Sequence, residues 1–195
     1  MPVVTLMMMA MLISVLNRSH YLRDYRTSVL PHFGNLILVL TVPLVLVDHQ
    51  VPEFWVHLAW LLLLLIGGLA SFIDWEEHVL PDRLILPTLL LSTLLLAMGR
   101  RFVPAVIGAS LWFVGFAFLA IINPTGLGWG DVKLAALLGA DCGALDLKLV
   151  PVAIFVALSS GGVVALFQIV KGNRRAQIAF GPFLFAGAIA ALLGA

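Results

Sequence analysis

The sequence predicts an all-α fold, a polytopic bundle of membrane helices with about eight transmembrane segments. Hydrophobic residues make up 62% of the chain and charged residues only 11%, whereas soluble domains carry roughly 25% charged residues. The mean hydropathy is +1.12. Because one crossing of a bilayer needs about 20 apolar residues, the 195 residues have room for several crossings.

The apolar residues fall into eight runs separated by polar connections. These runs are residues 3–16, 33–47, 54–73, 84–98, 103–122, 132–143, 150–170 and 178–193. The run 132–143 is too short to cross a bilayer comfortably, so we expect it to be tilted or shielded by neighbouring helices. No basic residue precedes the first run and no small-residue cleavage site follows it. It is therefore interpreted as a membrane helix and not as a signal peptide.

The whole chain, residues 1–195, is interpreted as one membrane-embedded domain, because no repeat, low-complexity tract or flexible linker is evident. Its single cysteine, Cys142, excludes an intramolecular disulfide and a CxxC zinc site. The histidines are scattered along the chain, which makes a metal site improbable. The formal net charge of +1 gives no indication of a nucleic-acid partner.

The basic residues orient the bundle, because cytoplasmic loops of membrane proteins are enriched in Lys and Arg. A cytoplasmic position for the connection 17–32 assigns every later connection by alternation. Eight basic residues then lie inside: Arg18, Arg23, Arg26, Arg83, Lys133, Lys171, Arg174 and Arg175. Three lie outside, and of these the pair Arg100 and Arg101 fits the rule poorly.

Two acidic residues stand at the ends of apolar runs on the same predicted side of the membrane. Asp74 follows the run 54–73, and Asp131 precedes the run 132–143. Two carboxylates within hydrogen-bond reach share one proton, because like charges a few ångströms apart cannot both ionise. The ionised member can take a proton from water while the other polarises a peptide carbonyl, which is the chemistry of an aspartic protease and needs no metal or cofactor.

The expected position of each carboxylate suggests which one carries the proton. An N-terminal helix end stabilises negative charge, so Asp131 is expected to ionise more easily than Asp74, which lies at a helix C-terminus. Gly126, Gly128 and Gly130 lead up to Asp131. We expect these glycines to adopt backbone conformations forbidden to other residues and to let a substrate backbone come close.

These stretches resemble the type IV prepilin peptidases, the intramembrane aspartyl proteases of the A24 family. The stretch G-L-G-W-G-D-V-K-L at 126–134 resembles the family's GxGD motif, and I-D-W-E-E-H-V-L-P-D at 73–82 resembles its other motif. Residues 180–184, F-G-P-F-L, are similar to the stretch that opens the family's last helix. The resemblance covers roughly residue 60 to the C-terminus and assigns the catalytic roles to Asp74 and Asp131.

The resemblance implies a function and a set of partners. It implies an endopeptidase, without cofactor, that removes a short basic leader from prepilin, pseudopilin or Tad-type precursors at the cytoplasmic face of the inner membrane. The pilus or type II secretion assembly machinery would be further partners. Longer members carry a Cys-rich domain, associated with N-methylation, where this chain has only residues 17–32 and no cysteine. The resemblance therefore supports the peptidase and argues against the methyltransferase.

The residues around the two aspartates have competing interpretations. Glu76 and Glu77 are expected to be solvated headgroup-level side chains that can attract a basic leader. Asp82 follows Pro81 and is expected to cap the next helix, with a place in the site as the alternative. Lys133 either adjusts the charge of Asp131, holds a substrate carboxylate, or is an interfacial lysine.

Two other classes of function stay open at this stage. A small proton- or cation-coupled transporter would place acidic groups near the middle of its apolar segments, with broken helices there. The acids of this chain are interpreted as lying at segment ends, which disfavours that reading. An inactive relative that binds pilin helices during assembly is the third possibility.

Overall fold

The computed structural model describes residues 47, 51, 53–124, 126–172 and 178–195. Among these residues the regular secondary structure is entirely helical, and there is no strand. The elements are α4 (Phe54–Leu62), η2 (Leu63–Gly67), α5 (Gly68–Glu77), α6 (Asp82–Met98), α7 (Phe102–Ile122), α8 (Trp129–Leu145), α9 (Leu149–Val170) and α10 (Gly181–Leu193). The predicted all-α bundle is confirmed, and each apolar run from 54 onward corresponds to a helix. The runs 3–16 and 33–47 and the loop 17–32 lie outside the described residues, apart from Val47, so the total of eight stays a prediction.

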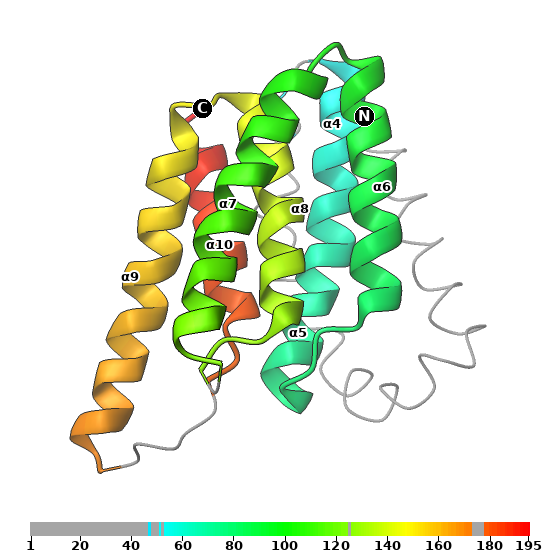
Figure 1. The fold of residues 1–195 in the computed structure, drawn as a ribbon. Helices are drawn as coiled ribbons and strands as arrows, with labels where there is room; N and C mark the ends of the chain where they lie inside the picture. The colour runs from blue at the N-terminus through cyan, green and yellow to red at the C-terminus, as the bar shows by residue number, and fades with distance from the viewer. Residues whose placement is uncertain (1–46, 48–50, 52, 125, 173–177) are drawn as a thin grey trace.

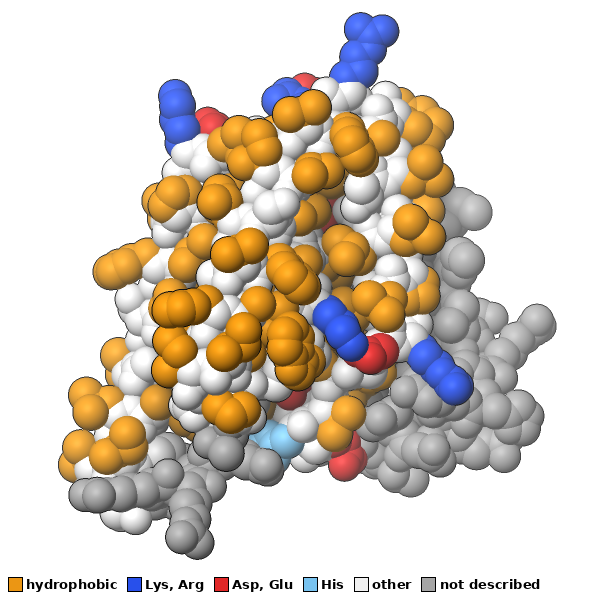
Figure 2. Space-filling model, in the orientation of Figure 1, with side chains coloured by type: hydrophobic (Ala, Val, Ile, Leu, Met, Phe, Trp, Pro, Cys, Tyr) orange, Lys and Arg blue, Asp and Glu red, His pale blue; other side chains and the backbone are white. Residues whose placement is uncertain are grey.

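Among the described residues, three helical stretches are long and apolar enough to cross a membrane. They are Phe54–Glu77, which joins α4, η2 and α5 into one run, Phe102–Ile122 and Leu149–Val170. The outer faces of α7 and α9 carry large exposed apolar side chains. Figure 2 shows apolar side chains spread over the flank of the bundle, with most charged side chains toward the two ends of the helices. Such a surface suits lipid as its solvent.

Successive helices run in alternating directions, so their ends gather at two levels (Figure 1). The end of α5 and the starts of α6 and α8 lie at one level. The opposite end carries an ion pair between Arg101 and Glu53, which join the start of α7 to the start of α4. This hydrogen-bonded contact lowers the pKa of the Glu53 carboxyl. Arg101, one of the two arginines that fit the charge rule poorly, therefore has an anionic partner at this end of the bundle.

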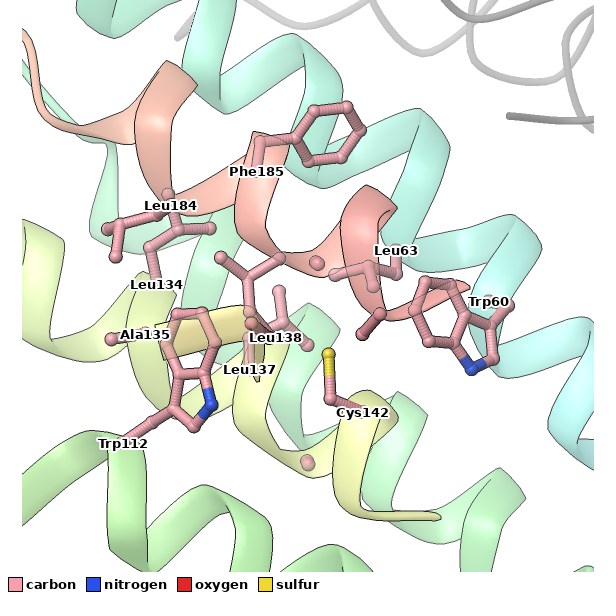
Figure 3. Close-up of a cluster of buried hydrophobic side chains, with 14 of the residues drawn as sticks. Trp60, Leu63, Trp112, Leu134, Ala135, Leu137, Leu138, Cys142, Leu184 and Phe185 are labelled. Carbon is pink, nitrogen blue, oxygen red and sulfur yellow. The ribbon is translucent and has the colours of Figure 1, made fainter. Parts of the chain in front are cut away.

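Helix α8 lies at the centre of the bundle, and its residues from Val132 to Ala144 are buried except for a partly exposed Lys133. Figure 3 shows side chains of α4, α7 and α10 closing around it, among them Trp60, Trp112 and Leu184. A helix that is apolar on all sides is a buried one. The prediction that this short segment is shielded by neighbouring helices is confirmed.

Glycines let α7 and α8 pack backbone to backbone. A Cβ atom on Gly108 of α7 would lie 2.1 Å from the carbonyl oxygen of Gly139 on α8. A Cβ atom on Gly143, one turn further along α8, would lie 2.5 Å from the carbonyl oxygen of Pro104. Small residues with a spacing of four are a common way to bring membrane helices close together. This packing brings α8 close against α7.

Candidate active site

Asp74 and Asp131 line one cavity of about 440 Å³ at the level where α5 ends and α8 begins. The cavity wall also includes part of the α5–α6 connection, both sides of the α7–α8 connection and the start of the segment leading into α10. These further lining residues are His78, Val79, Leu80, Asp82, Pro124, Gly126, Leu127, Gly128, Trp129, Gly130, Lys133 and Ile178. The two stretches that bear the predicted aspartates therefore meet around a single space.

Asp74 lies in the last turn of α5 and is tied to the start of α10. Its side chain is only 5% exposed. The Oδ2 atom accepts a hydrogen bond from the backbone N–H of Gly181 at 2.8 Å. One turn earlier on α5, the Ser71 hydroxyl donates to the Gly181 carbonyl oxygen at 3.2 Å. Two contacts thus fix the first residue of α10 against the carboxylate-bearing turn.

Asp131 is the third residue of α8 and is 8% exposed. Its Oδ2 atom accepts a hydrogen bond from the backbone N–H of Gly128, the N-cap residue, at 2.9 Å. Such a contact satisfies one of the unpaired N–H groups at a helix start. The other oxygen, Oδ1, is buried and has no hydrogen-bond partner among the described residues. Helix capping therefore accounts for one oxygen of this carboxylate and leaves the other available.

The two carboxylates lie close enough to interact electrostatically. We expected only Asp131 to lie at a helix N-terminus, but in the structure both carboxylates contact one. Asp74 is at the C-terminal end of α5, as predicted, but it also accepts the N–H of Gly181 at the N-terminal end of α10. Both carboxylates therefore meet a helix N-terminus, where negative charge is favoured. The helix-end argument for a proton on Asp74 does not hold in this fold.

The glycines before Asp131 do not adopt the backbone conformations that were predicted for them, whereas their use in letting a substrate backbone come close stays a prediction. None of Gly126, Gly128 and Gly130 has a positive φ, and Gly128 has φ −86° and ψ 160°, which is ordinary extended backbone. Gly130 is needed for space instead, because a Cβ atom there would lie 2.8 Å from Leu80 Cβ. Its missing side chain lets the α5–α6 connection pack directly on the start of α8.

Asp82 and Lys133 form an ion pair across the cavity wall. The Lys133 Nζ atom donates to Asp82 Oδ2 at 2.6 Å, and both side chains are partly exposed. Asp82 makes no capping hydrogen bond at the start of α6, so the prediction that it caps that helix is wrong. Its alternative, a place in the cavity wall, is the one observed. The pair joins the starts of α6 and α8, a contact that the sequence interpretation of Lys133 did not include.

The remaining residues of the first motif have different positions. Glu76 and Glu77 are exposed at the end of α5, as expected for solvated side chains. Pro81 is buried and is the N-cap residue of α6. His78 ends α5 in the left-handed region, with φ 54° and ψ 35°, and is exposed at the cavity. Within the described part of the chain, no three His, Cys, Asp or Glu side chains converge as metal ligands would.

Gly181 and Ser71 are the site residues that the sequence interpretation did not single out. The F-G-P-F-L stretch was a usable signal, because it begins at Phe180 and α10 starts one residue later. A Cβ atom on Gly181 would lie 2.9 Å from Asp74 Oδ2. Only glycine leaves the carboxylate its present position at this contact.

The fold and the cavity define a class of protein: a membrane protein of apolar helices with a pair of buried carboxylates at one end of the bundle. Residues 56–166 match the Type IV leader peptidase family, more than half of the chain. The chain therefore belongs to the Type IV leader peptidase family. This confirms the resemblance that the two motifs indicated, and with it the assignment of the chain as a peptidase-family membrane protein.

Several relatives carry the name prepilin leader peptidase/N-methyltransferase. One from Aeromonas salmonicida (strain A449) is 37% identical over 82% of this chain and 57% of its own length. One from Neisseria gonorrhoeae is 37% identical over 71% of this chain and 49% of its own length. One from Dichelobacter nodosus is 41% identical over 64% of this chain and 44% of its own length. The chain thus spans about half the length of the curated relatives it matches. No solved structure matches it significantly.

Proposed function

We propose that this protein is an aspartyl endopeptidase that removes the leader from type IV prepilin-like precursors, with Asp74 and Asp131 as its catalytic pair. The observation that carries the proposal is the shared cavity lined by both carboxylates. Family membership supports the reaction class, because the matched relatives are named prepilin leader peptidases. The methyltransferase activity in those names is not part of the proposal.

The surroundings of the carboxylates suggest that the two oxygens of each carboxylate have different roles. A backbone N–H holds one oxygen of each carboxylate, from Gly181 for Asp74 and from Gly128 for Asp131. The remaining oxygen of each is then free to face a shared water molecule. These hydrogen bonds hold the reacting groups in a fixed geometry. Correct orientation of the reacting groups supplies much of the rate enhancement in such reactions.

The reaction follows from a pair that holds one proton. The ionised carboxylate takes a proton from water, and the water oxygen attacks the carbonyl carbon of the scissile peptide bond. The protonated carboxyl donates a hydrogen bond to the carbonyl oxygen and stabilises the negative charge that develops there. A proton then passes to the departing amine as the C–N bond breaks. The pair ends with one proton, as it began.

The proposed substrate is a membrane-anchored precursor whose basic leader meets the enzyme at the cytoplasmic face. Glu76 and Glu77 are exposed beside the turn that carries Asp74 and supply negative charge for that leader. The apolar helix of the precursor would lie in the bilayer alongside the bundle. We propose the pilus or secretion machinery as a further partner, because it is the system that would receive the cleaved product.

Co-expression with a type IV prepilin that retains its leader tests the proposal. The expected result is loss of the leader with the wild-type protein, detected by a mobility shift and by N-terminal sequencing of the pilin. Asp74→Asn and Asp131→Asn each keep the size of the side chain and should leave the precursor uncut. Asp146→Asn, at the far end of α8, is the matched control and should process normally. Full processing by either aspartate variant would refute the assigned roles.

One observation favours the transporter alternative. Asp141 lies inside α8 and is 0% exposed, so the interpretation that all acids lie at segment ends is wrong for this residue. However, both of its oxygens contact the Ser92 hydroxyl and the residue is fully enclosed, which suits a helix contact better than an ion path. Proton or cation flux into liposomes, dependent on Asp141, is the result that would support transport. Binding of prepilin without cleavage is the result expected of an inactive assembly protein.

A further inference from the structure

A second polar contact in the bundle lies away from the cavity, between α6 and α8. The Ser92 hydroxyl of α6 is 3.0 Å from each carboxylate oxygen of Asp141 on α8. Both residues are 0% exposed. Neither belongs to the motif stretches, and neither lines the cavity that holds Asp74 and Asp131.

Burial shapes what this contact can be. An ionised carboxylate with a single hydroxyl partner, enclosed among apolar helices, would lack most of the hydrogen bonds that make a buried charge tolerable. A neutral carboxyl group meets the requirement at far lower cost. Because both of its oxygens lie 3.0 Å from Ser92 Oγ, it can accept the Ser92 hydrogen bond on one oxygen and donate its own O–H to the Ser92 oxygen from the other. It then places no charge in the bundle interior.

The Ser92–Asp141 contact is one of two polar contacts between the parallel helices α6 and α8, and it lies further from the starts of these helices than the other. Helices α6 and α8 start at the same end of the bundle and run in the same direction (Figure 1). Near their starts, Asp82 pairs with Lys133. Ser92 lies ten positions after Asp82 and Asp141 eight positions after Lys133, which places the second contact about 12–15 Å further along the helices at 1.5 Å per residue.

Two such contacts at different heights define the register of α8 against α6. Apolar contacts alone specify an axial position weakly, whereas a directional hydrogen bond between buried groups specifies one strongly, and registry is the best-attested use of buried polar groups. Register matters here because α8 carries Asp131 near its start, while the connection into α6 packs on Gly130 through Leu80. A shift of α8 along α6 would move Asp131 relative to Asp74.

We propose that Ser92 and Asp141 are a positioning pair for the reaction: a neutral carboxyl–hydroxyl contact inside the bundle that holds Asp131 at the height of Asp74. This inference rests on the proposed peptidase function. The pair does not touch the substrate or the reacting atoms. Its effect on the reaction is through the position of α8.

Purified protein in proteoliposomes, with a prepilin substrate, provides the kinetic test. The Ser92→Ala/Asp141→Leu double variant replaces the polar contact with apolar side chains, so it should unfold at or above the wild-type temperature. Its kcat should fall by about ten- to a hundredfold, the scale of a small misplacement of reacting groups, with KM within about twofold of wild type. The single variant Asp141→Asn keeps an uncharged polar contact with Ser92, so its kcat should be close to that of wild type. A double variant as fast as wild type, or Asp141→Asn as slow as the double variant, would overturn the proposal.

Infrared spectroscopy tests the same pair without any protease activity. In an Asp74→Asn/Asp131→Asn background at neutral pH, Asp141 should give the carbonyl band of a protonated, hydrogen-bonded carboxyl group. Adding Asp141→Asn should remove that band, and adding Ser92→Ala should move it to higher frequency. Absence of the band contradicts the proposed pair. Failure of wild-type protein to cleave prepilin, with the band present, contradicts the peptidase function instead.

Discussion

The backbone N–H of Gly181 donates a hydrogen bond to Asp74 Oδ2 at 2.8 Å, so the first residue of α10 anchors the carboxylate at the end of α5. The two residues are 107 positions apart in the chain. The contact leaves no space for a side chain, since a Cβ atom on Gly181 would lie 2.9 Å from that oxygen. The Asp74 carboxylate can therefore be held in this position only because residue 181 has no side chain.

Gly181→Ala should lower kcat because the added methyl group displaces the Asp74 carboxylate, the most movable atom group that it meets. We expect a loss of about tenfold or more, as for other small misplacements of reacting groups. Steady-state cleavage of a prepilin by the purified variant measures it. Gly115→Ala is the matched control, because a Cβ atom there meets nothing within 4 Å. Equal activity of the two variants would show that the Gly181 contact has no role in the reaction.

The two glycines of the G-W-G-D stretch should respond differently to alanine. Gly130→Ala puts a methyl group 2.8 Å from Leu80 Cβ, so it should push the two motif stretches apart and reduce cleavage about tenfold or more. Gly128→Ala meets its nearest atom, Asp131 Oδ2, at 3.5 Å and has an extended backbone, so it should keep most of its activity. Parallel cleavage assays compare them. The reverse order of activities would contradict the packing explanation.

The acidic end of α5 should affect substrate binding more than chemistry. Because Glu76 and Glu77 are exposed, each contributes only a modest attraction to a basic leader. We expect the Glu76→Gln/Glu77→Gln double variant to raise KM by about two- to tenfold at low salt with kcat unchanged, and the difference to shrink as salt is added. A precursor whose leader lysines are replaced by glutamine is the control. An equal KM effect on that precursor would exclude charge attraction as the cause.

Close packing of α7 on α8 should be sensitive to a single methyl group. Gly108→Ala would bring a Cβ atom to 2.1 Å from the Gly139 carbonyl oxygen, which belongs to the backbone and cannot move aside easily. We expect a loss of about 1–3 kcal/mol in the free energy of unfolding, the usual cost of overpacking. Unfolding in mixed micelles measures it. Gly115→Ala, on the same helix, meets nothing within 4 Å and should be at least as stable as wild type, because alanine favours a helix more than glycine does. A loss of the same size at Gly115 would contradict packing as the cause.

The features that local sequence determines could be predicted. The apolar runs from residue 54 onward predict the helices, and the alternation of their directions brings Asp74 and Asp131 to one side. Both signals are local or follow from counting crossings. The expected placement of Asp74 at a helix end and Asp131 at a helix start is what the structure has.

The pairings across helices could not be predicted in the same way. Helix α8 is apolar on nearly every side, so no stripe in its sequence indicates which residue faces which neighbour. The contacts of Lys133 with Asp82, Asp141 with Ser92 and Asp74 with Gly181 all depend on how helices are rotated about their axes. The packing role of Gly130 could not be predicted for the same reason, because it depends on a side chain fifty positions earlier, Leu80.

The most direct test of the central claim is the rate of prepilin cleavage by four purified proteins in bilayers: wild type, Asp74→Asn, Asp131→Asn and the double variant. If the two carboxylates act as one unit on one water molecule, each single variant should lose at least about a hundredfold in rate. The double variant should then be no slower than either single variant, since residues that act together are non-additive. Substantial cleavage by either single variant, or a double loss equal to the product of the two single losses, would contradict a shared catalytic pair.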